Sequence, residues 1–333
     1  MVAKVFIDGA VGTTGLEIRE RLAGRGEFSL LQLSDADRKD VRARAAALND
    51  ADVVILCLPD EAARDAVGLI ENPSVRVIDA SSAHRVAPGW VYGFPELEKD
   101  QRAKIASARR VSNPGCWPTG FLVLVRPLVR AGIIPADFPL TVTGVSGYSG
   151  GGKAMIEEFE DRNSPRYVET IARTYGLTLA HKHTPEMRVH SGLAHAPVFS
   201  PNVGRFYRGM IAEVPLQLWA LPGKPNVFDL HRAIANAYRG EKLIEVSGLD
   251  QIDLLMKGAL QAGQVPPFSA LPQTIDAEML KLTNGMKIYV FGNDKTQQAR
   301  LIAVFDNLGK GASGAAVQNL NIMCGLPETA GLV

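Results

Sequence analysis

Short apolar runs alternate with amphipathic segments over the first 110 residues of the chain. Segments at 16–24, 41–49 and 61–71 have helical character, and each lies between two apolar runs. The runs, all of strand length, read AKVFIDG, FSLLQLS, DVVILCLP and VRVIDAS. Strands that are apolar throughout and alternate with helices are typical of a parallel sheet covered on both faces. We therefore predict a doubly wound α/β domain of the Rossmann type.

The pattern changes in the second half of the chain. GFLVLVRPLVRAG predicts a helix that Gly132 closes and that Pro127 kinks or shortens. From about residue 140 onward strands dominate, in LTVTGVSGY, MIAEVPLQLWA, KLIEVSG, MKIYVFGN and ARLIAVFDN. Few helices separate them, so we expect an α+β domain with a mixed or largely antiparallel sheet. GASGAAVQNLNIMCGL predicts a last helix that returns to the first domain.

The first strand ends in a glycine-rich turn, DGAVGTTGLEIRERL, with Gly9, Gly12 and Gly15 at three-residue spacing. A helix that begins here directs its free backbone N–H groups at an incoming phosphate. The spacing differs from the commoner G-x-G-x-x-G, but the position between a first strand and a first helix favours dinucleotide binding. A purely structural turn is the alternative.

The end of the second strand predicts which dinucleotide binds. An acidic residue there holds the ribose 2′-hydroxyl of NAD, whereas cations receive the 2′-phosphate of NADP. In LSDADRKD, Ser34, Arg38 and Lys39 suit a phosphate, while Asp35 and Asp37 argue for NAD. We favour NADP. The predicted division is a cofactor-binding domain at 1–114, a catalytic and oligomerisation domain at 115–306, and a C-terminal helix at 307–333.

Composition narrows the class of protein. The chain has 333 residues and a net charge of +1, which does not suggest binding to nucleic acid. Three cysteines without framework spacing favour a reducing compartment. No apolar run is long enough for a membrane span and no signal peptide opens the chain, so we expect a cytoplasmic protein.

A second glycine-rich stretch, GYSGGGKA, resembles a phosphate-binding loop. Ala154 stands where that loop needs a Ser or Thr hydroxyl for magnesium. Tyr148 and Lys153 are five residues apart, which separates them on a helix. We expect a loop that borders the substrate site, with a triphosphatase as the less favoured reading.

Cys116 follows the breaker run Asn113-Pro114-Gly115 and begins the predicted helix. A helix N-terminus lowers a thiol pKa, and its N–H groups stabilise an oxyanion that forms when the thiolate attacks a carbonyl. The Asn113 amide is a further candidate donor to that oxyanion. A buried, inert cysteine is the alternative, and it suits Cys57 and Cys324 better.

Four of the six histidines lie in HKHTPEMRVHSGLAH, at positions 181, 183, 190 and 195. A His-x-His pair in a strand places both imidazoles on one face, with Glu186 near enough to orient one of them as a base. A metal site is the alternative, but neither Cys-x-x-Cys nor His-Glu-x-x-His accompanies the cluster, so we expect no metal. We expect His84 and His231 to be surface or structural residues.

Motifs along almost the whole chain resemble the shorter form of the N-acetyl-gamma-glutamyl-phosphate reductase family. They are GAVGTTG, DASSAHR, YGFPEL, SNPGCWPTG, GVSGYSGGGK, HKHTPEM and DNLGKGASGAAVQN. This family is related to the aspartate-semialdehyde and glyceraldehyde-3-phosphate dehydrogenases. The resemblance implies an NADPH-dependent reduction of an acyl phosphate to an aldehyde in arginine biosynthesis, by a homodimer or homotetramer.

The resemblance also implies roles for single residues. Cys116 is similar to the nucleophile that forms a thioester, and His183 to the acid–base, with His181 close behind and Glu186 in support. The remaining positions are similar to the pyrophosphate loop (Gly9, Gly12, Thr13, Thr14, Gly15), to a nicotinamide contact (Asn307), and to positions near cofactor and substrate phosphate (Ser81, Ser82, Arg85). The compact SSAHR departs from the longer form of the family, which leaves the role of Arg85 less defined.

Two alternatives to this function stay open. One is a sibling reductase of aspartyl phosphate or of a carrier-linked aminoadipyl phosphate, with the same thiol chemistry. The other is a nucleotide-binding protein without catalysis, for which Cys116 is dispensable.

Overall fold

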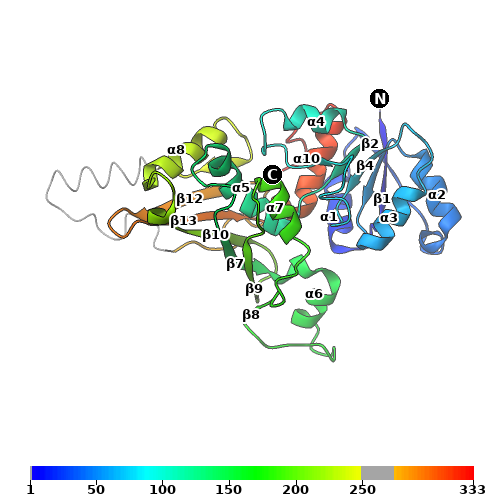
Figure 1. The fold of residues 1–333 in the computed structure, drawn as a ribbon. Coiled ribbons are helices and arrows are strands. Elements are labelled where there is room, and N and C mark those ends of the chain that lie inside the picture. The colour runs from blue at the N-terminus through cyan, green and yellow to red at the C-terminus, as the bar shows by residue number, and fades with distance from the viewer. Residues whose placement is uncertain (1, 249–273) are drawn as a thin grey trace.

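The computed structural model describes residues 2–248 and 274–333 and contains two β-sheets (Figure 1). The first sheet has six strands in the order β2-β1-β3-β4-β6-β5, and every neighbouring pair is parallel. Its strands are β1 (Ala3–Asp8), β2 (Phe28–Leu31), β3 (Val53–Leu56), β4 (Arg76–Asp79), β5 (Val91–Tyr92) and β6 (Arg110–Ser112). The predicted Rossmann-type sheet is therefore confirmed.

Helices cover both faces of this sheet because its strands are apolar on both sides. Val5 and Ile7 of β1 face one helical layer, and Phe6 faces the other. The first layer holds α1 (Thr13–Leu22), α4 (Gln101–Ser107) and α10 (Gly314–Met323), and the second holds α2 (Val41–Asp50) and α3 (Asp60–Gly68). The last helix thus returns to the first sheet, where Val317 and Leu320 pack with Ile78 (Figure 1).

The second sheet has seven strands in the order β11-β12-β13-β10-β7-β9-β8. β10 is antiparallel to β13 and to β7, whereas β7 and β9 are parallel, so the predicted mixed sheet is confirmed. Its strands are β7 (Thr141–Gly147), β8 (Ala172–Thr174), β9 (Val198–Gly204), β10 (Met210–Gln217), β11 (Ile244–Val246), β12 (Met286–Asn293) and β13 (Gln298–Phe305). Three helices lie between them, α6 (Gly152–Glu160), α7 (Thr184–Ser191) and α8 (Val227–Ala237), and the sequence pattern did not reveal the last two.

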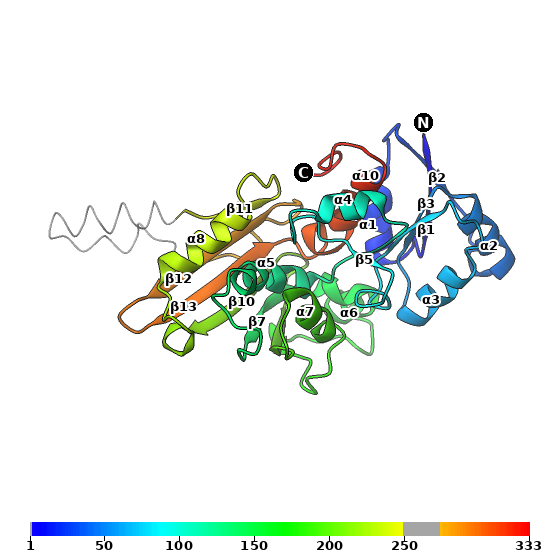
Figure 2. The ribbon, with the colours of Figure 1, turned by 45° about the horizontal axis from the view of Figure 1, so that its top comes forward.

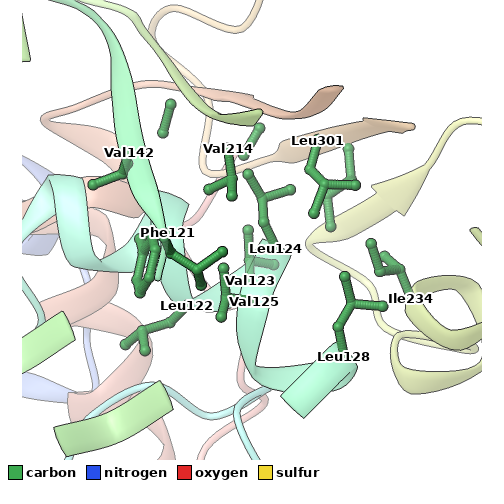
Figure 3. Packing of buried hydrophobic residues seen from close by; sticks show 14 of the residues in the cluster. Phe121, Leu122, Val123, Leu124, Val125, Leu128, Val142, Val214, Ile234 and Leu301 are labelled. Atoms are coloured by element: carbon green, nitrogen blue, oxygen red, sulfur yellow. The ribbon is translucent and has the colours of Figure 1, made fainter. Parts of the chain in front are cut away.

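The central helix α5 (Cys116–Arg130) lies with α8 against the second sheet (Figure 2). Phe121, Leu124 and Leu128 pack with Val214 and Leu301 of the sheet (Figure 3). This apolar core fixes the helix along its length. The residue at its first position is therefore held in place by the core beneath it.

Of the two effects predicted for Pro127, a kink or a shortening, the shortening does not occur, and the helix continues to Arg130. Proline lacks the N–H that would bond the carbonyl of Val123, four residues earlier. The buried hydroxyl of Tyr238 donates to that carbonyl instead, at 2.9 Å. A side chain 115 residues away thus removes the cost of the unpaired carbonyl, which no local pattern predicts.

Among the described residues, no helix is both long and apolar enough to cross a bilayer.

A buried ion pair joins the turn before α10 to the loop that follows β5. The Lys310 ammonium donates to both carboxylate oxygens of Glu96, at 2.7 and 2.8 Å, and both side chains are almost fully buried. Gln318 completes the cluster, because it accepts from Lys310 at 2.6 Å and donates to Glu96 at 2.9 Å. Neither charge is left without a partner, as burial requires.

We predict that Lys310→Met lowers the free energy of unfolding by about 3–5 kcal/mol, because it leaves the Glu96 carboxylate buried without its cation. The matched control is Lys104→Met, which removes an exposed pair with Asp100 and changes stability by less than about 1 kcal/mol. Urea denaturation of the two variants makes the comparison. Equal, small losses would contradict the structural importance of the buried pair.

Candidate active site

Cys116 occupies the first position of α5, immediately after the loop 113–115 that leaves β6. It faces a cavity of about 440 Å³, which we call the thiol cavity. Both halves of the chain contribute side chains to its wall. The polar and charged side chains of this wall include Thr13, Thr14, Arg85, Asn113, Ser149, Tyr175, His181, Lys182, His183 and Asn307. Most of the predicted catalytic residues thus share one cavity with the N-terminal glycine-rich loop.

Glycine at position 115 allows two polar side chains to approach the residue before the thiol. A Cβ at this position would lie 2.5 Å from Nη1 of Arg85 and 2.6 Å from Nε2 of His183. Both distances are shorter than any non-bonded contact allows. A side chain here would displace the guanidinium and the imidazole from the thiol.

The Glu186 carboxylate holds this arrangement together. Its Oε1 accepts from the Tyr92 hydroxyl at 2.6 Å and from the Gly115 N–H at 2.8 Å, and its Oε2 accepts from Arg85 Nη1 at 3.0 Å. The predicted role of orienting a histidine is wrong, because no imidazole within the described ranges bonds this carboxylate. The side chain points to the guanidinium and the start of α5 instead.

The thiol pKa differs from the prediction. Burial raises the pKa of Cys116 to about 11, and the nearby Glu186 carboxylate acts in the same direction. The Arg85 guanidinium, the Trp117 N–H and the Lys182 ammonium oppose this rise without cancelling it. The helix N-terminus therefore does not produce a preformed thiolate, and the reaction needs a base close to the sulfur.

His183 is placed to supply that base. It lies immediately before α7 and is 7% exposed, and burial together with the Arg85 charge holds its pKa well below 6.5. The ring is therefore neutral at neutral pH and can accept a proton. Its Nδ1 is buried without a partner in the part of the chain that the structure describes. His181 lies next to it and accepts the backbone N–H of His183 at Nδ1, at 3.2 Å.

The predicted strand around these histidines is wrong. Residues 181–183 form a turn, and α7 begins at Thr184 with Pro185 in its first turn. Proline is favoured there because the first helical N–H groups have no partner within the helix. The dipeptide Thr184-Pro185 is thus the sequence signal that the strand interpretation missed.

Two asparagines of the cavity are committed to the surrounding structure. The Asn113 amide donates to the Ala312 carbonyl at 2.9 Å, and its oxygen accepts from Asn319 at 3.1 Å. Asn307 accepts the Gly209 N–H at 2.8 Å and donates to the Ser149 hydroxyl at 3.0 Å. Each still lines the cavity, so their predicted contacts with an oxyanion and with the nicotinamide stay predictions.

The residues of DASSAHR divide into two groups. Arg85 lines the thiol cavity, whereas Ser81 donates to Asp79 and Ser82 donates to Asp60, both at 2.7 Å. Ser82 is not among the residues that line the thiol cavity, so the structure does not bring it to that site. Its hydroxyl instead fixes the loop after β4 against the start of α3.

The glycine-rich turn after β1 has the conformation that a pyrophosphate site requires. Gly9 has φ of +88°, and a Cβ there would lie 2.3 Å from the Cys57 carbonyl. The first bond within α1 runs from Leu16 to Gly12, so the N–H groups of Thr13, Thr14 and Gly15 come before it. Thr13 and Thr14 also line the thiol cavity. The turn therefore fits the pyrophosphate of a dinucleotide at the edge of the cavity that contains the thiol.

A second cavity of about 590 Å³ lies at the ends of β1 and β2, and we call it the basic cavity. Its charged lining residues are Arg19, Arg38, Lys39, Arg44, Asp8 and Asp35, four cations against two carboxylates. The Ser34 hydroxyl donates to Asp37 at 2.7 Å and so stabilises the turn that carries Arg38. Arg44 is held by Asp8 at 2.7 Å. Neither Arg19 nor Arg44 was predicted from the sequence.

The second glycine-rich stretch borders the thiol cavity, as expected. Ser149 and residues 150–152 contribute to its wall, in a short 3₁₀ turn before α6. The Tyr148 hydroxyl bonds Glu160 at 2.9 Å. Neither Tyr148 nor Lys153 belongs to the cavity wall.

His84 and His231, which we expected to be surface or structural residues, make contacts within the fold. His84 Nδ1 contacts Asp79 at 2.6 Å and its ring stacks on Trp90, and His231 contacts the Ser247 carbonyl at 2.9 Å. Burial raises the pKa of Cys57 to about 12. Within residues 2–248 and 274–333, no group of three His, Cys, Asp or Glu side chains is arranged to hold a metal ion.

Two polar residues of the thiol cavity, Tyr175 and Lys182, were missed from the sequence. Tyr175 lies in an irregular segment after β8, and Lys182 separates the two histidines. Only the Lys182 position gave a signal, because a residue between two site histidines lies close to the same site.

Comparison with known proteins agrees with this geometry. Residues 4–105 match the model of the semialdehyde dehydrogenase NAD binding domain, and residues 116–307 match that of the semialdehyde dehydrogenase dimerisation domain. The aspartate semialdehyde dehydrogenase II of Vibrio cholerae, solved with ASA, has a TM-score of 0.69 at 16% identity and covers 97% of this chain and 98% of its own. The Candida albicans aspartate semialdehyde dehydrogenase with NADP has a TM-score of 0.65 at 13% identity, over 97% and 99%. These two structures share the fold.

Sequence relatives are more similar. N-acetyl-gamma-glutamyl-phosphate reductase 2 of Nostoc sp. is 50% identical over 332 residues, which covers 99% of each chain. The N-acetyl-gamma-glutamyl-phosphate reductase of Chelativorans sp. is 52% identical over 327 residues, which covers 97% of this chain and 98% of its own. The chain therefore belongs to the N-acetyl-gamma-glutamyl-phosphate reductases of the semialdehyde dehydrogenase family.

Proposed function

We propose that this protein reduces N-acetyl-L-glutamyl 5-phosphate with NADPH to N-acetyl-L-glutamate 5-semialdehyde and phosphate, a step of arginine biosynthesis. The observation that carries the proposal is the shared cavity. Cys116, His183, Arg85 and the threonines of the pyrophosphate turn all line it. The names of the full-length relatives support the same substrate.

Thioester formation is the first step that these residues support. His183 takes the proton of the Cys116 thiol, and the sulfur attacks the carbonyl carbon of the acyl phosphate. A C–S bond forms and the C–O bond to phosphate breaks, and the proton leaves with the phosphate. Arg85 adds positive charge beside the departing phosphate and, through its effect on the thiol pKa, favours the thiolate.

Reduction of the thioester is the second step. NADPH, when bound at the glycine-rich turn, supplies the hydride that the thioester carbon accepts. His183, which takes up a proton from solvent after the phosphate has left, then gives this proton to the carbonyl oxygen. The resulting thiohemiacetal collapses to the aldehyde, and Cys116 regains its proton.

Several features of the basic cavity support NADP over NAD. Arg38 pairs with Asp35 at 3.5 Å, but both side chains are largely exposed, so this pair is weak. Arg38 and Lys39 are therefore free to receive a 2′-phosphate, and Arg19 lines the same cavity. Ser34 supports the turn that carries them. Ser81, beside Asp79 at the end of β4, is proposed to contact the same cofactor.

The proposal extends to assembly and location. The matched dimerisation domain supports a homodimer or homotetramer. Three free cysteines are compatible with a cytoplasmic protein. We propose no metal cofactor, and we keep the division at 1–114, 115–306 and 307–333.

The reverse reaction tests the proposal. Purified protein with NADP⁺ and phosphate is expected to form NADPH, followed by absorbance, from N-acetyl-L-glutamate 5-semialdehyde and not from aspartate semialdehyde. Cys116→Ser is expected to bind NADPH normally and to lose turnover. Activity with aspartate semialdehyde alone would assign the chain another substrate, and inactivity with both aldehydes would refute the proposal.

Removing the cations of the basic cavity is expected to weaken the binding of NADPH much more than the binding of NADH. Arg38→Ala combined with Lys39→Ala should weaken NADPH binding about ten- to a hundredfold, because charge-assisted hydrogen bonds to the 2′-phosphate are lost. NADH binding should hardly change. Arg42→Ala, an exposed cation outside this cavity, is the control. Equal weakening of both cofactors would contradict the 2′-phosphate assignment.

The pH dependence of the histidine variants is expected to identify the base. Because the pKa of His183 lies well below 6.5, the wild-type rate should fall only below that pH, as the ring becomes protonated. His183→Asn should remove this acid limb and lower kcat by about 10²–10⁴, whereas His181→Asn should retain the limb. Wild-type profiles in both variants would place the acid–base function elsewhere.

A further inference from the structure

The side chain of Trp117, the residue after the thiol, makes one hydrogen bond among the described residues, and this bond determines how a neighbouring tyrosine is oriented. The indole Nε1 donates to the Tyr175 hydroxyl at 2.7 Å, and Trp117 is almost fully buried. An indole N–H donates and cannot accept. The phenol oxygen is therefore the acceptor in this bond, and the phenol proton must point elsewhere.

That proton has no acceptor in the part of the chain that the structure describes. The bond from Trp117 is the sole hydrogen bond recorded for the Tyr175 hydroxyl within residues 2–248 and 274–333. Tyr175 lines the thiol cavity with Cys116, His181 and Lys182. Burial raises the pKa of Tyr175, so the phenol keeps its proton. The cavity thus contains a neutral donor that a ligand can use.

The charges around the cavity suggest which ligand group takes this bond. The substrate carries two anionic groups, the phosphate and the α-carboxylate, and two neutral carbonyl acceptors, the reacting carbonyl and the acetamido carbonyl. Arg85 and Lys182 supply cations for the anions, and Lys182 has no ion-pair partner among the described residues. A neutral donor suits a neutral carbonyl, because a buried carbonyl oxygen without a partner costs binding energy.

Position favours the same assignment. Tyr175 meets the far end of the Trp117 side chain, one residue beyond the thiol. It therefore suits a group several bonds from the reacting carbonyl better than the carbonyl itself. Ser149 is another hydroxyl of the cavity whose proton has no acceptor in the described ranges, but it accepts a hydrogen bond from Asn307, and it provides a comparison.

We propose that the Tyr175 hydroxyl, oriented by Trp117, donates a hydrogen bond to the acetamido carbonyl of the substrate and so selects the acetylated chain. This proposal rests on the proposed function, because it names how that substrate is recognised. Tyr175 is then a specificity residue that takes no part in proton transfer at the thiol.

The test compares two aldehydes of equal chain length, N-acetyl-L-glutamate 5-semialdehyde and 5-oxopentanoate, which lacks the acetamido group. Tyr175→Phe should lower kcat/KM about five- to a hundredfold for the acetylated aldehyde and less than about twofold for the other. Inhibition constants of N-acetyl-L-glutamate and glutarate give a second reading that needs no turnover of the poorer aldehyde. In Tyr175→Phe, the inhibition constant of N-acetyl-L-glutamate should rise and that of glutarate should not.

Matched variants complete the design. Tyr167→Phe removes a phenol outside the cavity, whose ring packs beside Arg205, and should change neither substrate. Trp117→Phe should lower kcat/KM for the acetylated aldehyde alone. Combined with Tyr175→Phe, it should cause no further loss. NADPH affinity shows whether each variant is folded.

Equal losses on both aldehydes, no loss on either, or a selective loss in Ser149→Ala instead would overturn the proposal. A wild-type protein inactive with the acetylated aldehyde would refute the proposed function itself, so the two failures are distinguishable.

Discussion

A buried carboxylate, that of Glu186, holds the site in its working geometry. Burial of an anion is costly unless every oxygen is paired. Here the Arg85 guanidinium, the Tyr92 hydroxyl and the Gly115 N–H satisfy it. These three groups come from separate segments of the chain, and Glu186 itself lies on α7. One side chain therefore joins the loop after β4, the strand β5 and the first turn of α5.

The same contacts explain the chemistry at the sulfur. The carboxylate that fixes Arg85 also raises the thiol pKa, and burial raises it further. A thiol protected in this way does not react indiscriminately, because the thiolate is the reactive form. The neutral imidazole of His183 lies beside the preceding residue and can remove the proton when a substrate is bound. Protection and reactivity thus depend on the same small set of neighbours.

Much of the architecture followed from local patterns in the sequence. The parallel sheet follows from strands that are apolar on both faces, and α2 begins at Val41 as its pattern predicts. Long-range contacts set the limits. Pro127 remains helical because Tyr238 bonds the buried carbonyl that proline leaves without a donor, and Glu186 pairs with Arg85, 101 residues away in the chain. Such pairings have no local signature.

The residues of the site could be predicted from the sequence better than their pKa values. Cys116, His183 and the glycine-rich turn were identified from residue type and position, and they line one cavity. The thiol pKa was predicted with the wrong sign, because a helix N-terminus was considered without the burial around it. Tyr175 was not identified, because its orientation depends on Trp117, in a different element.

A single-turnover measurement tests the thioester on Cys116 most directly. Protein mixed with NADP⁺ and N-acetyl-L-glutamate 5-semialdehyde, without phosphate, has no acceptor for the acyl group. The account predicts a burst of one NADPH per site and an added N-acetylglutamyl group on the peptide that contains Cys116. No burst before phosphate is added, or an acyl group on any other residue, would contradict it.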